Sequence, residues 1–115
     1  MIYAMSDLHG CYDKYTRMLD RINFSESDTL YILGDVVDRG PDGIKILLDM
    51  FSRKNVVPIR GNHDHLAWKL LKPTVTKEHS DDEIADIVRM WFDDGGIPTY
   101  TAFTSLEKDK KKLLL

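Results

Sequence analysis

Three short stretches of this 115-residue chain carry residue types that can bind metals and move protons. They are "SDLHG" with Asp7 and His9, "GDVVDRG" with Asp35, Asp38 and Arg39, and "RGNHD" with Asn62, His63 and Asp64. Carboxylate, imidazole and amide groups form a hard to borderline ligand set, which suits Mn, Fe or Zn without any thiolate. Two metals about 3.5–4 Å apart can clamp a phosphoryl group and activate water. The three stretches therefore predict a divalent-metal site for phosphate chemistry.

Each stretch has an ordinary explanation when it is taken alone. An Asp-x-His pair is common by chance, and Asp35 and Asp38 could be turn and cap residues before a helix that starts near Pro41. Asn62 or Asp64 could cap the next helix, since Asn and Asp are favoured N-caps. The metal site is favoured because all three polar stretches occur in order, each directly after a predicted buried strand.

The elements that must position these residues alternate between apolar strands and amphipathic helices. Strands are predicted over residues 2–6, 29–34 and 55–59, and helices over residues 12–22, 43–51, 65–71, 80–92 and 99–106. Pro58 weakens the third strand, because proline cannot donate to a ladder, and Pro73 is expected to stop the helix that begins at residue 65. Ser80 and Glu83 have the spacing of a capping box. The segment "DDGGIP" is expected to break the helix before it, and the lysine-rich tail from Glu107 is expected to fray.

This alternation predicts an α/β fold, a βαβαβα arrangement with a parallel sheet and flanking helices. In such sheets, ligands gather beyond the carboxyl ends of the strands. The loops after the three strands should therefore converge at one edge of the sheet. Residues i and i+2 of an extended segment point the same way, so Asp7 and His9 can reach one ion. Gly10, Gly34 and Gly61 would let the backbone approach a ligand closely.

The three stretches together resemble the motifs of the calcineurin-like metallophosphoesterases, D-x-H, G-D-x-x-D-R-G and G-N-H-[DE]. The arginine and second glycine of "GDVVDRG" are most similar to the phosphoprotein phosphatase branch, which includes serine/threonine protein phosphatases and diadenosine tetraphosphate hydrolases. "WFDDGGIPT" also resembles a W-x-x-x-G-G-x-x-T segment of the bacterial members, through Trp91, Gly95, Gly96 and Thr99. The resemblance implies one half of a metallophosphoesterase β-sandwich and spans nearly the whole chain.

The resemblance also implies metal ligands. Asp7 and His9 would bind the first metal, Asp35 would bridge both metals, and Asn62 would bind the second. Two metals would be expected, with Mn favoured and Fe or Zn as alternatives. In the family, two later histidines complete the second metal, and neither His65 nor His79 is expected to replace them.

Catalytic roles follow from the same resemblance. His63 would be the general acid that protonates the leaving oxygen, and Asp38 would hold its imidazole. Arg39 would grip the phosphate, a contact that suits the planar guanidinium fork. Asp64 is expected to support the loop or the start of the helix and to bind no metal.

Residues 1–115 are expected to form a single domain, the amino-terminal part of a metallophosphoesterase domain without its second half. An apolar sheet face would then lack its cover, which invites self-association. The formal net charge of -3 argues against a nucleic-acid partner, because such proteins usually carry a basic face. No apolar run is long enough to span a membrane. The single cysteine, Cys11, allows no internal disulfide and favours a cytoplasmic location.

The expected function is a metal-dependent phosphoesterase that hydrolyses phosphate monoesters through a metal-activated water, in the manner of serine/threonine protein phosphatases. Its substrate partner would be a phosphoprotein or a nucleotide polyphosphate. One alternative is a dinucleoside polyphosphate hydrolase. Another is a catalytically silent fragment that binds metal or phosphate.

Overall fold

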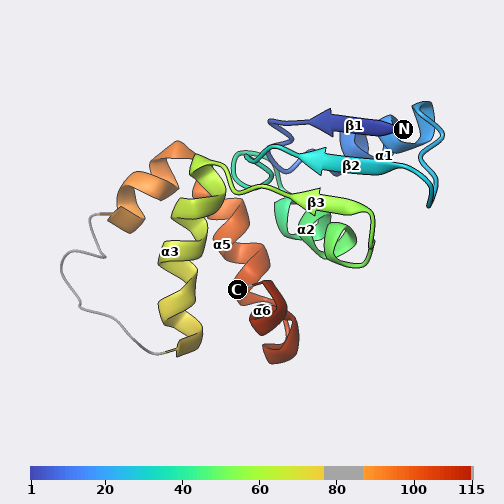
Figure 1. The fold of residues 1–115 in the computed structure, drawn as a ribbon. Helices are drawn as coiled ribbons and strands as arrows, with labels where there is room; N and C mark the ends of the chain where they lie inside the picture. The colour runs from blue at the N-terminus through green and yellow to red at the C-terminus, as the bar shows by residue number, and fades with distance from the viewer. Residues whose placement is uncertain (77–86, 115) are drawn as a thin grey trace.

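The computed structural model describes residues 1–76 and 87–114, and it contains a three-stranded parallel sheet (Figure 1). The strands are β1 (Ile2–Met5), β2 (Thr29–Ile32) and β3 (Val56–Pro58), in the spatial order β1-β2-β3. Helix α1 (Tyr12–Arg21) connects β1 to β2, and helix α2 (Gly43–Phe51) connects β2 to β3. The predicted α/β class and parallel sheet are thus confirmed.

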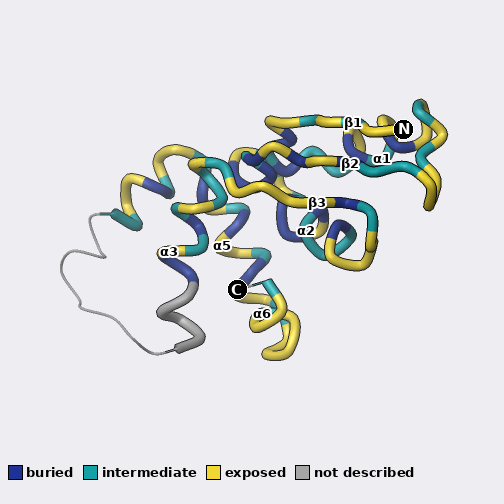
Figure 2. Tube along the Cα trace, in the orientation of Figure 1, coloured by how far each residue is buried: buried dark blue, intermediate teal, exposed yellow. Residues whose placement is uncertain are grey.

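Both connecting helices pack on the same face of the sheet. Right-handed crossovers that step in one direction, from β1 to β2 to β3, place their helices on one side. Successive side chains of a strand point to opposite faces of the sheet. Leu30, Ile32 and Val56 point to the face that the helices cover, and they are buried there. They form one core cluster with side chains of α1 and α2, including Tyr15, Leu19, Ile46 and Met50. The buried positions of α1 and α2 lie where these helices face the strands (Figure 2).

The opposite face of the sheet is apolar and exposed. Its side chains alternate with the buried ones and include Ile2, Tyr31, Leu33, Val57 and Ile59, which are between 37% and 74% exposed. Tyr31 pairs with Ala4 on one side and with Val57 on the other, so these residues form a continuous row across the three strands. We call this surface the open face. It matches the expectation of an uncovered apolar sheet face.

Pro58 fits at the end of β3 because β3 is an edge strand of the described sheet. The backbone N–H of Ile59 donates to the carbonyl of Ile32 at 2.8 Å. Since successive residues of a strand direct their amides to opposite sides, the nitrogen of Pro58 faces the edge where no ladder bond is needed.

The remaining helices lie beyond the carboxyl ends of the strands, toward which the strand arrows point (Figure 1). They are α3 (Asn62–Thr76), a helical stretch over residues 87–91, the π-helical turn η1 (Phe92–Gly96), α5 (Ile97–Thr104) and α6 (Lys108–Leu114). Trp91, Phe103 and Leu70 from these segments build a second core cluster with Val37 and Ile44. Val36 belongs to the first cluster and Val37 to the second, so the loop after β2 joins the two cores.

Several predicted boundaries were wrong. Helix α3 begins at Asn62 and not at His65, because the N–H of His65 already bonds the Gly61 carbonyl at 2.9 Å. It runs through Pro73 to Thr76, since an internal proline removes one helical hydrogen bond without always ending the helix. Helix α5 begins two residues early, at Ile97, with Pro98 in its first turn.

The tail from residue 108 is helical rather than frayed. The side chains of Leu106 and Leu114 pack against the second core cluster, and this contact stabilises the turn. The expected break at "DDGGIP" is confirmed, because Asp94 and Gly95 have non-helical backbone angles inside η1. The expected capping pair of Ser80 and Glu83 lies outside the described residues. Among the described helices, none combines the length and the apolar character that crossing a bilayer requires.

Candidate metal and phosphate site

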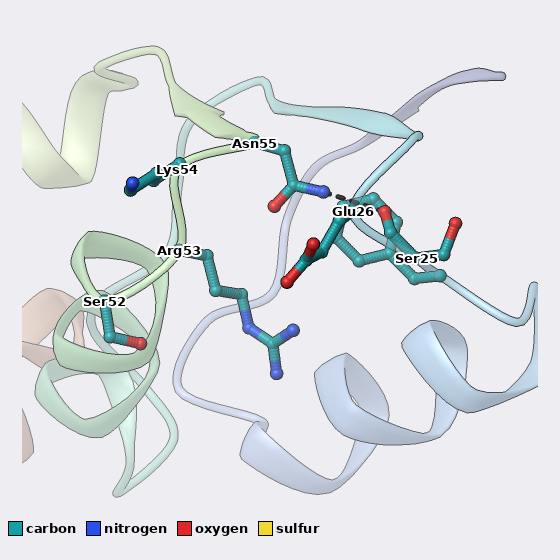
Figure 3. A pocket seen from close by; sticks show the side chains of 7 residues that line it. Ser25, Glu26, Ser52, Arg53, Lys54 and Asn55 are labelled. Carbon is teal, nitrogen blue, oxygen red and sulfur yellow. Dashed lines mark hydrogen bonds between the residues drawn. The ribbon is translucent and has the colours of Figure 1, made fainter.

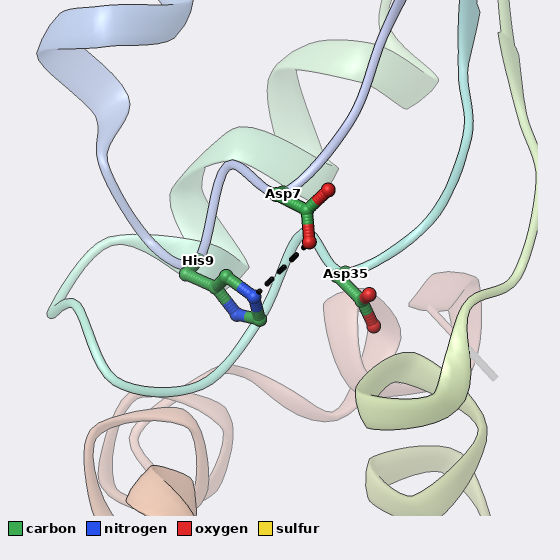
Figure 4. A group of neighbouring side chains, drawn as sticks. All are labelled: Asp7, His9 and Asp35. Atoms are coloured by element: carbon green, nitrogen blue, oxygen red, sulfur yellow. Dashed lines mark ion pairs between the residues drawn. The ribbon is translucent and has the colours of Figure 1, made fainter.

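Asp7, His9 and Asp35 come together at the carboxyl ends of β1 and β2. One ligand atom from each residue lies within 4.8 Å of the other two (Figure 4). The strands are parallel neighbours, with Met5 paired to Ile32, so the loops that follow them start side by side. The N–H of His9 donates to the carbonyl of Asp35 at 2.9 Å, and this bond holds the two loops at that spacing.

The imidazole of His9 has the tautomer that a metal ligand needs. Its Nδ1 atom lies 3.2 Å from the carbonyl oxygen of Val37, which can only accept, so Nδ1 carries the proton. The Nε2 lone pair is then directed toward Asp7, whose Oδ1 lies 3.6 Å away. A backbone carbonyl that fixes the imidazole in this way is usual around metal-binding histidines. Two carboxylates and one such imidazole fit a divalent cation.

Asn62 and His63 reach this edge from the first turn of α3. The N–H of His63 donates to Oδ1 of Asp35 at 3.2 Å, which places the third loop directly beside the metal-binding group. The rings of His63 and His9 meet edge to face with centroids 4.9 Å apart. Asn62 is exposed at the margin of the group, one residue before His63. All three predicted stretches therefore meet at one edge of the sheet.

Asp38 lies below this edge with its side chain fully buried. Its Oδ2 atom is 2.9 Å from Nδ1 of His63. The contact between these two residues that the family resemblance implies is thus present. Sequence reasoning did not anticipate two further partners of Asp38, Trp91 and Thr99, which approach it from the segment over residues 91–99.

Arg39 projects toward solvent, and its guanidinium meets Asp94. The distance from the Arg39 Nη2 atom to Oδ1 of Asp94 is 3.5 Å, and Oδ2 of Asp94 is 3.6 Å from Nε2 of His63. Asp94 therefore places a carboxylate between the two groups that the resemblance assigns to phosphate binding and to proton donation. Its motif position next to two glycines was noticed in the sequence, but nothing there indicated this contact.

Five of the site residues have a left-handed backbone. The φ angles of Asp7, His9, Asp35, Asp38 and Arg39 lie between 41° and 73°. Such angles are uncommon for residues other than glycine and cost of order 1–3 kcal/mol each. They turn the chain sharply after β1 and β2, which is how side chains close in sequence come to face one small volume.

Glycine lets the loops pack on one another rather than on a ligand, which corrects the sequence-based interpretation. A Cβ atom on Gly34 would lie 2.5 Å from the Cα atom of Gly61, so the loops after β2 and β3 touch backbone to backbone. Asp64 completes this link. Its carboxylate accepts hydrogen bonds from the N–H groups of Val36 and Gly61, at 2.9 and 3.0 Å. The expected role of Asp64 as a loop support is therefore confirmed.

A separate hollow of about 610 Å³ lies at the opposite edge of the sheet (Figure 3). It is lined by residues before β2 and between α2 and β3, among them Ser25, Arg53 and Asn55. Its main polar groups are already paired, since the Arg53 Nε atom donates to Asp49 at 2.9 Å and the Asn55 amide donates to the carbonyl of Ser25 at 2.9 Å. None of the predicted site residues lines it.

Comparison with known proteins places these features in a family. Residues 1–113 match the family model described as "Calcineurin-like phosphoesterase". A symmetrical bis(5'-nucleosyl)-tetraphosphatase of Legionella pneumophila (strain Lens) is 39% identical over 100 residues, which are 81% of this chain and 34% of that protein. An enzyme of the same name from Wigglesworthia glossinidia brevipalpis is 35% identical over 88 residues, 75% of this chain and 32% of that protein. The chain thus spans about a third of the length of these relatives.

The fold has a counterpart among solved structures. A crystal structure of a protein provisionally called a diadenosine tetraphosphatase superposes with a TM-score of 0.52 at 24% identity, and covers 98% of this chain and 45% of that one. This likeness supports the fold alone. Family metals are divalent cations, and the group of Asp7, His9 and Asp35 is a possible place for one. On the match over residues 1–113, the chain belongs to the calcineurin-like phosphoesterase family.

Proposed function

We propose that this protein is a metal-dependent hydrolase of dinucleoside polyphosphates. The sequence analysis placed phosphate monoesters first and this activity second. The relatives named above as symmetrical tetraphosphatases favour the second, because they share 35–39% identity over stretches that cover 75–81% of this chain. This likeness is the observation that carries the proposal.

Asp7, His9, Asp35 and Asn62 would hold the divalent metals, with Mn expected. When bound, such cations supply Lewis-acid polarisation of phosphoryl oxygens and a means of activating water. The chain's own residues supply the rest. His63 is held at Nδ1 by Asp38, so its Nε2 atom is the one that can hand a proton to a leaving phosphate oxygen. Arg39 is exposed at the rim and can bind a phosphate through two parallel N–H donors.

The carboxylate of Asp94 now lies where an anionic substrate would meet these two groups. A phosphate that binds Arg39 would replace this contact, and the exchange would free both Arg39 and Nε2 of His63 for the substrate. Asp38 has no such exposure, so its hold on His63 would persist during binding.

The proposal is tested by offering two substrates to the purified chain in the presence of Mn²⁺. Diadenosine tetraphosphate should yield two molecules of ADP, which is symmetrical cleavage, and p-nitrophenyl phosphate should be hydrolysed more slowly. The variant His63→Asn should lower the rate by roughly 10²–10⁴-fold, the usual contribution of a general acid. Faster hydrolysis of p-nitrophenyl phosphate would favour the monoesterase instead. Metal binding without turnover of either compound would favour a silent binding module.

A further inference from the structure

Every oxygen of the buried Asp38 carboxylate is bonded by a neighbouring side chain. Oδ1 lies 2.7 Å from the Thr99 hydroxyl. Oδ2 lies 2.7 Å from the indole nitrogen of Trp91 and 2.9 Å from Nδ1 of His63. The side chain of Asp38 has no exposed surface, so protein groups alone decide where its oxygens point.

The direction of each hydrogen bond can be assigned from the chemistry of the partners. An indole nitrogen can only donate. The Thr99 hydroxyl already accepts the backbone N–H of Asp38 at 2.9 Å, so its single proton is directed to Oδ1. Asp38 is therefore an acceptor toward all of its partners, and His63 meets it with a protonated Nδ1.

The two supporting residues come from a distant part of the chain. Trp91 and Thr99 are separated from Asp38 by 53 and 61 residues, and both are at least 98% buried. Between them, the carbonyl of Gly95 accepts the N–H of Arg39 at 2.7 Å. The segment over residues 91–99 thus makes hydrogen bonds to Asp38 through two side chains and to the backbone of Arg39 through one carbonyl.

We propose that Trp91 and Thr99 are positioning residues that fix the Asp38 carboxylate and, through it, the tautomer and direction of the His63 imidazole. The consequence for catalysis rests on the proposed function, in which His63 donates a proton through Nε2. If Asp38 could rotate, Nδ1 of His63 would lose the carboxylate that holds it, and Nε2 would no longer be held toward the phosphate.

Packing alone does not account for this arrangement. A purely structural role would need the volume of the indole ring and of the Thr99 methyl group, and phenylalanine and valine would supply most of that volume. Hydrogen bonds to a buried charge are stronger than neutral ones and depend on the donor itself. The polar atoms of Trp91 and Thr99 can therefore be tested separately from their bulk.

The experiment observes His63 directly, by long-range ¹H–¹⁵N correlation spectra of the metal-free chain at one neutral pH. Thr99→Val removes the hydroxyl, Thr99→Ser keeps it, and Trp91→Phe removes the indole donor. Thr104→Val is the matched control, because the Thr104 hydroxyl lies on the same helix and bonds the Tyr100 carbonyl at 2.9 Å. His63→Gln identifies the signals that belong to His63.

The wild-type chain, Thr99→Ser and Thr104→Val should show a His63 Nδ1 proton that exchanges slowly with water. In Thr99→Val and Trp91→Phe, this proton should exchange with water at least about tenfold faster, or its signal should vanish. Circular dichroism checks that each variant is folded.

Unchanged His63 signals in folded Thr99→Val and Trp91→Phe would overturn the proposal. If these two variants do not fold, Thr99→Ser tests the proposal. Serine keeps the hydroxyl, so loss of the His63 Nδ1 proton in this variant would show that the hydroxyl does not hold Asp38. The measurement uses neither metal nor substrate, so its outcome is independent of whether the chain cleaves dinucleoside polyphosphates.

Discussion

The Oδ1 atom of Asp64 accepts the backbone N–H of Val36 at 2.9 Å, and this bond fastens the first turn of α3 to the loop after β2. The same oxygen lies 3.3 Å from the N–H of Val37, and the other oxygen accepts the N–H of Gly61. One carboxylate thus serves three amides that no strand or helix could satisfy, because all three lie where the backbone leaves the sheet.

Asp64→Asn should destabilise the chain and weaken metal binding together. The amide keeps one acceptor oxygen, so at least one of these N–H groups loses its partner, which costs about 1–3 kcal/mol. Urea unfolding measures the stability, and calorimetric titration with Mn²⁺ measures the binding. Asp20→Asn, an exposed change on α1, is the control and should alter neither. Equal behaviour of the two variants would show that Asp64 is dispensable.

Asp35→Asn should abolish most of the Mn²⁺ binding. Asp35 contributes a carboxylate to the group with Asp7 and His9, and an amide oxygen carries no charge to replace it. The affinity should fall by more than the roughly 10–100-fold that is typical for loss of an outer partner of a metal ligand. Calorimetric titration gives this value, and Asp13→Asn controls for the loss of one negative charge elsewhere. Retention of wild-type affinity would place the metal at other residues.

Asp94→Asn should strengthen the binding of inorganic phosphate. The variant removes a carboxylate that pairs with Arg39, yet both partners are more than half exposed, so the gain should stay below about fivefold. Calorimetric titration with phosphate, with Mg²⁺ present, tests this expectation. Asp93→Asn removes the same charge one residue away and should change the affinity less. A fall in affinity for Asp94→Asn would mean that Asp94 positions Arg39 and does not compete with the ligand.

Tyr15→Phe should lower stability near neutral pH and flatten its dependence on alkaline pH. Burial, and then the hydrogen bond to Asp49 at 2.7 Å, raise the pKa of Tyr15 well above its ordinary value. A raised folded pKa gives stability that is complete below the ordinary pKa near 10 and is lost as the pH rises above it. The variant lacks this contribution, about 1 kcal/mol or more at neutral pH. Urea unfolding at several pH values, where the gap between the two chains should narrow above pH 10, provides the measurement.

Tyr31→Lys should raise the monomeric fraction of the chain. Tyr31 lies in the middle of the open face, between Ala4 and Val57, and a charge there opposes contact between two such faces. Light scattering after size-exclusion chromatography compares this variant with Lys14→Gln, a change on exposed α1 surface. If the wild-type chain is already monomeric at high concentration, the open face does not drive self-association.

The sequence was sufficient to predict the sheet and the meeting of the three loops. The strands that end before Asp7, Asp35 and Asn62 are short, apolar and separated by amphipathic helices, and local pattern alone determines such elements. Parallel order then places the loops at one edge. Asp7, His9 and Asp35 come together for this reason, with no need for further information.

Contacts between distant segments could not be predicted in this way. Thr99 bonds Asp38 across 61 residues of sequence, and Asp94 reaches Arg39 from the turn η1. No periodicity in the sequence predicts either contact. The helical tail also depends on such packing, since Leu114 is placed by the second core cluster. The left-handed angles at Asp35 and Asp38 were equally hidden, because aspartate adopts a positive φ more often than most residues but still only in a minority of its positions.

Those left-handed residues have a consequence for how the protein folds. The loops after β1 and β2 share these five unfavourable backbone conformations, so their closed shape depends on crossovers and cores that are already in place. We therefore expect the metal-binding edge to form late in folding and to be among the first parts to open when the cores loosen. Affinity for a divalent cation then reports on the integrity of the whole domain, and the cation would in turn act as a ligand that favours the folded state.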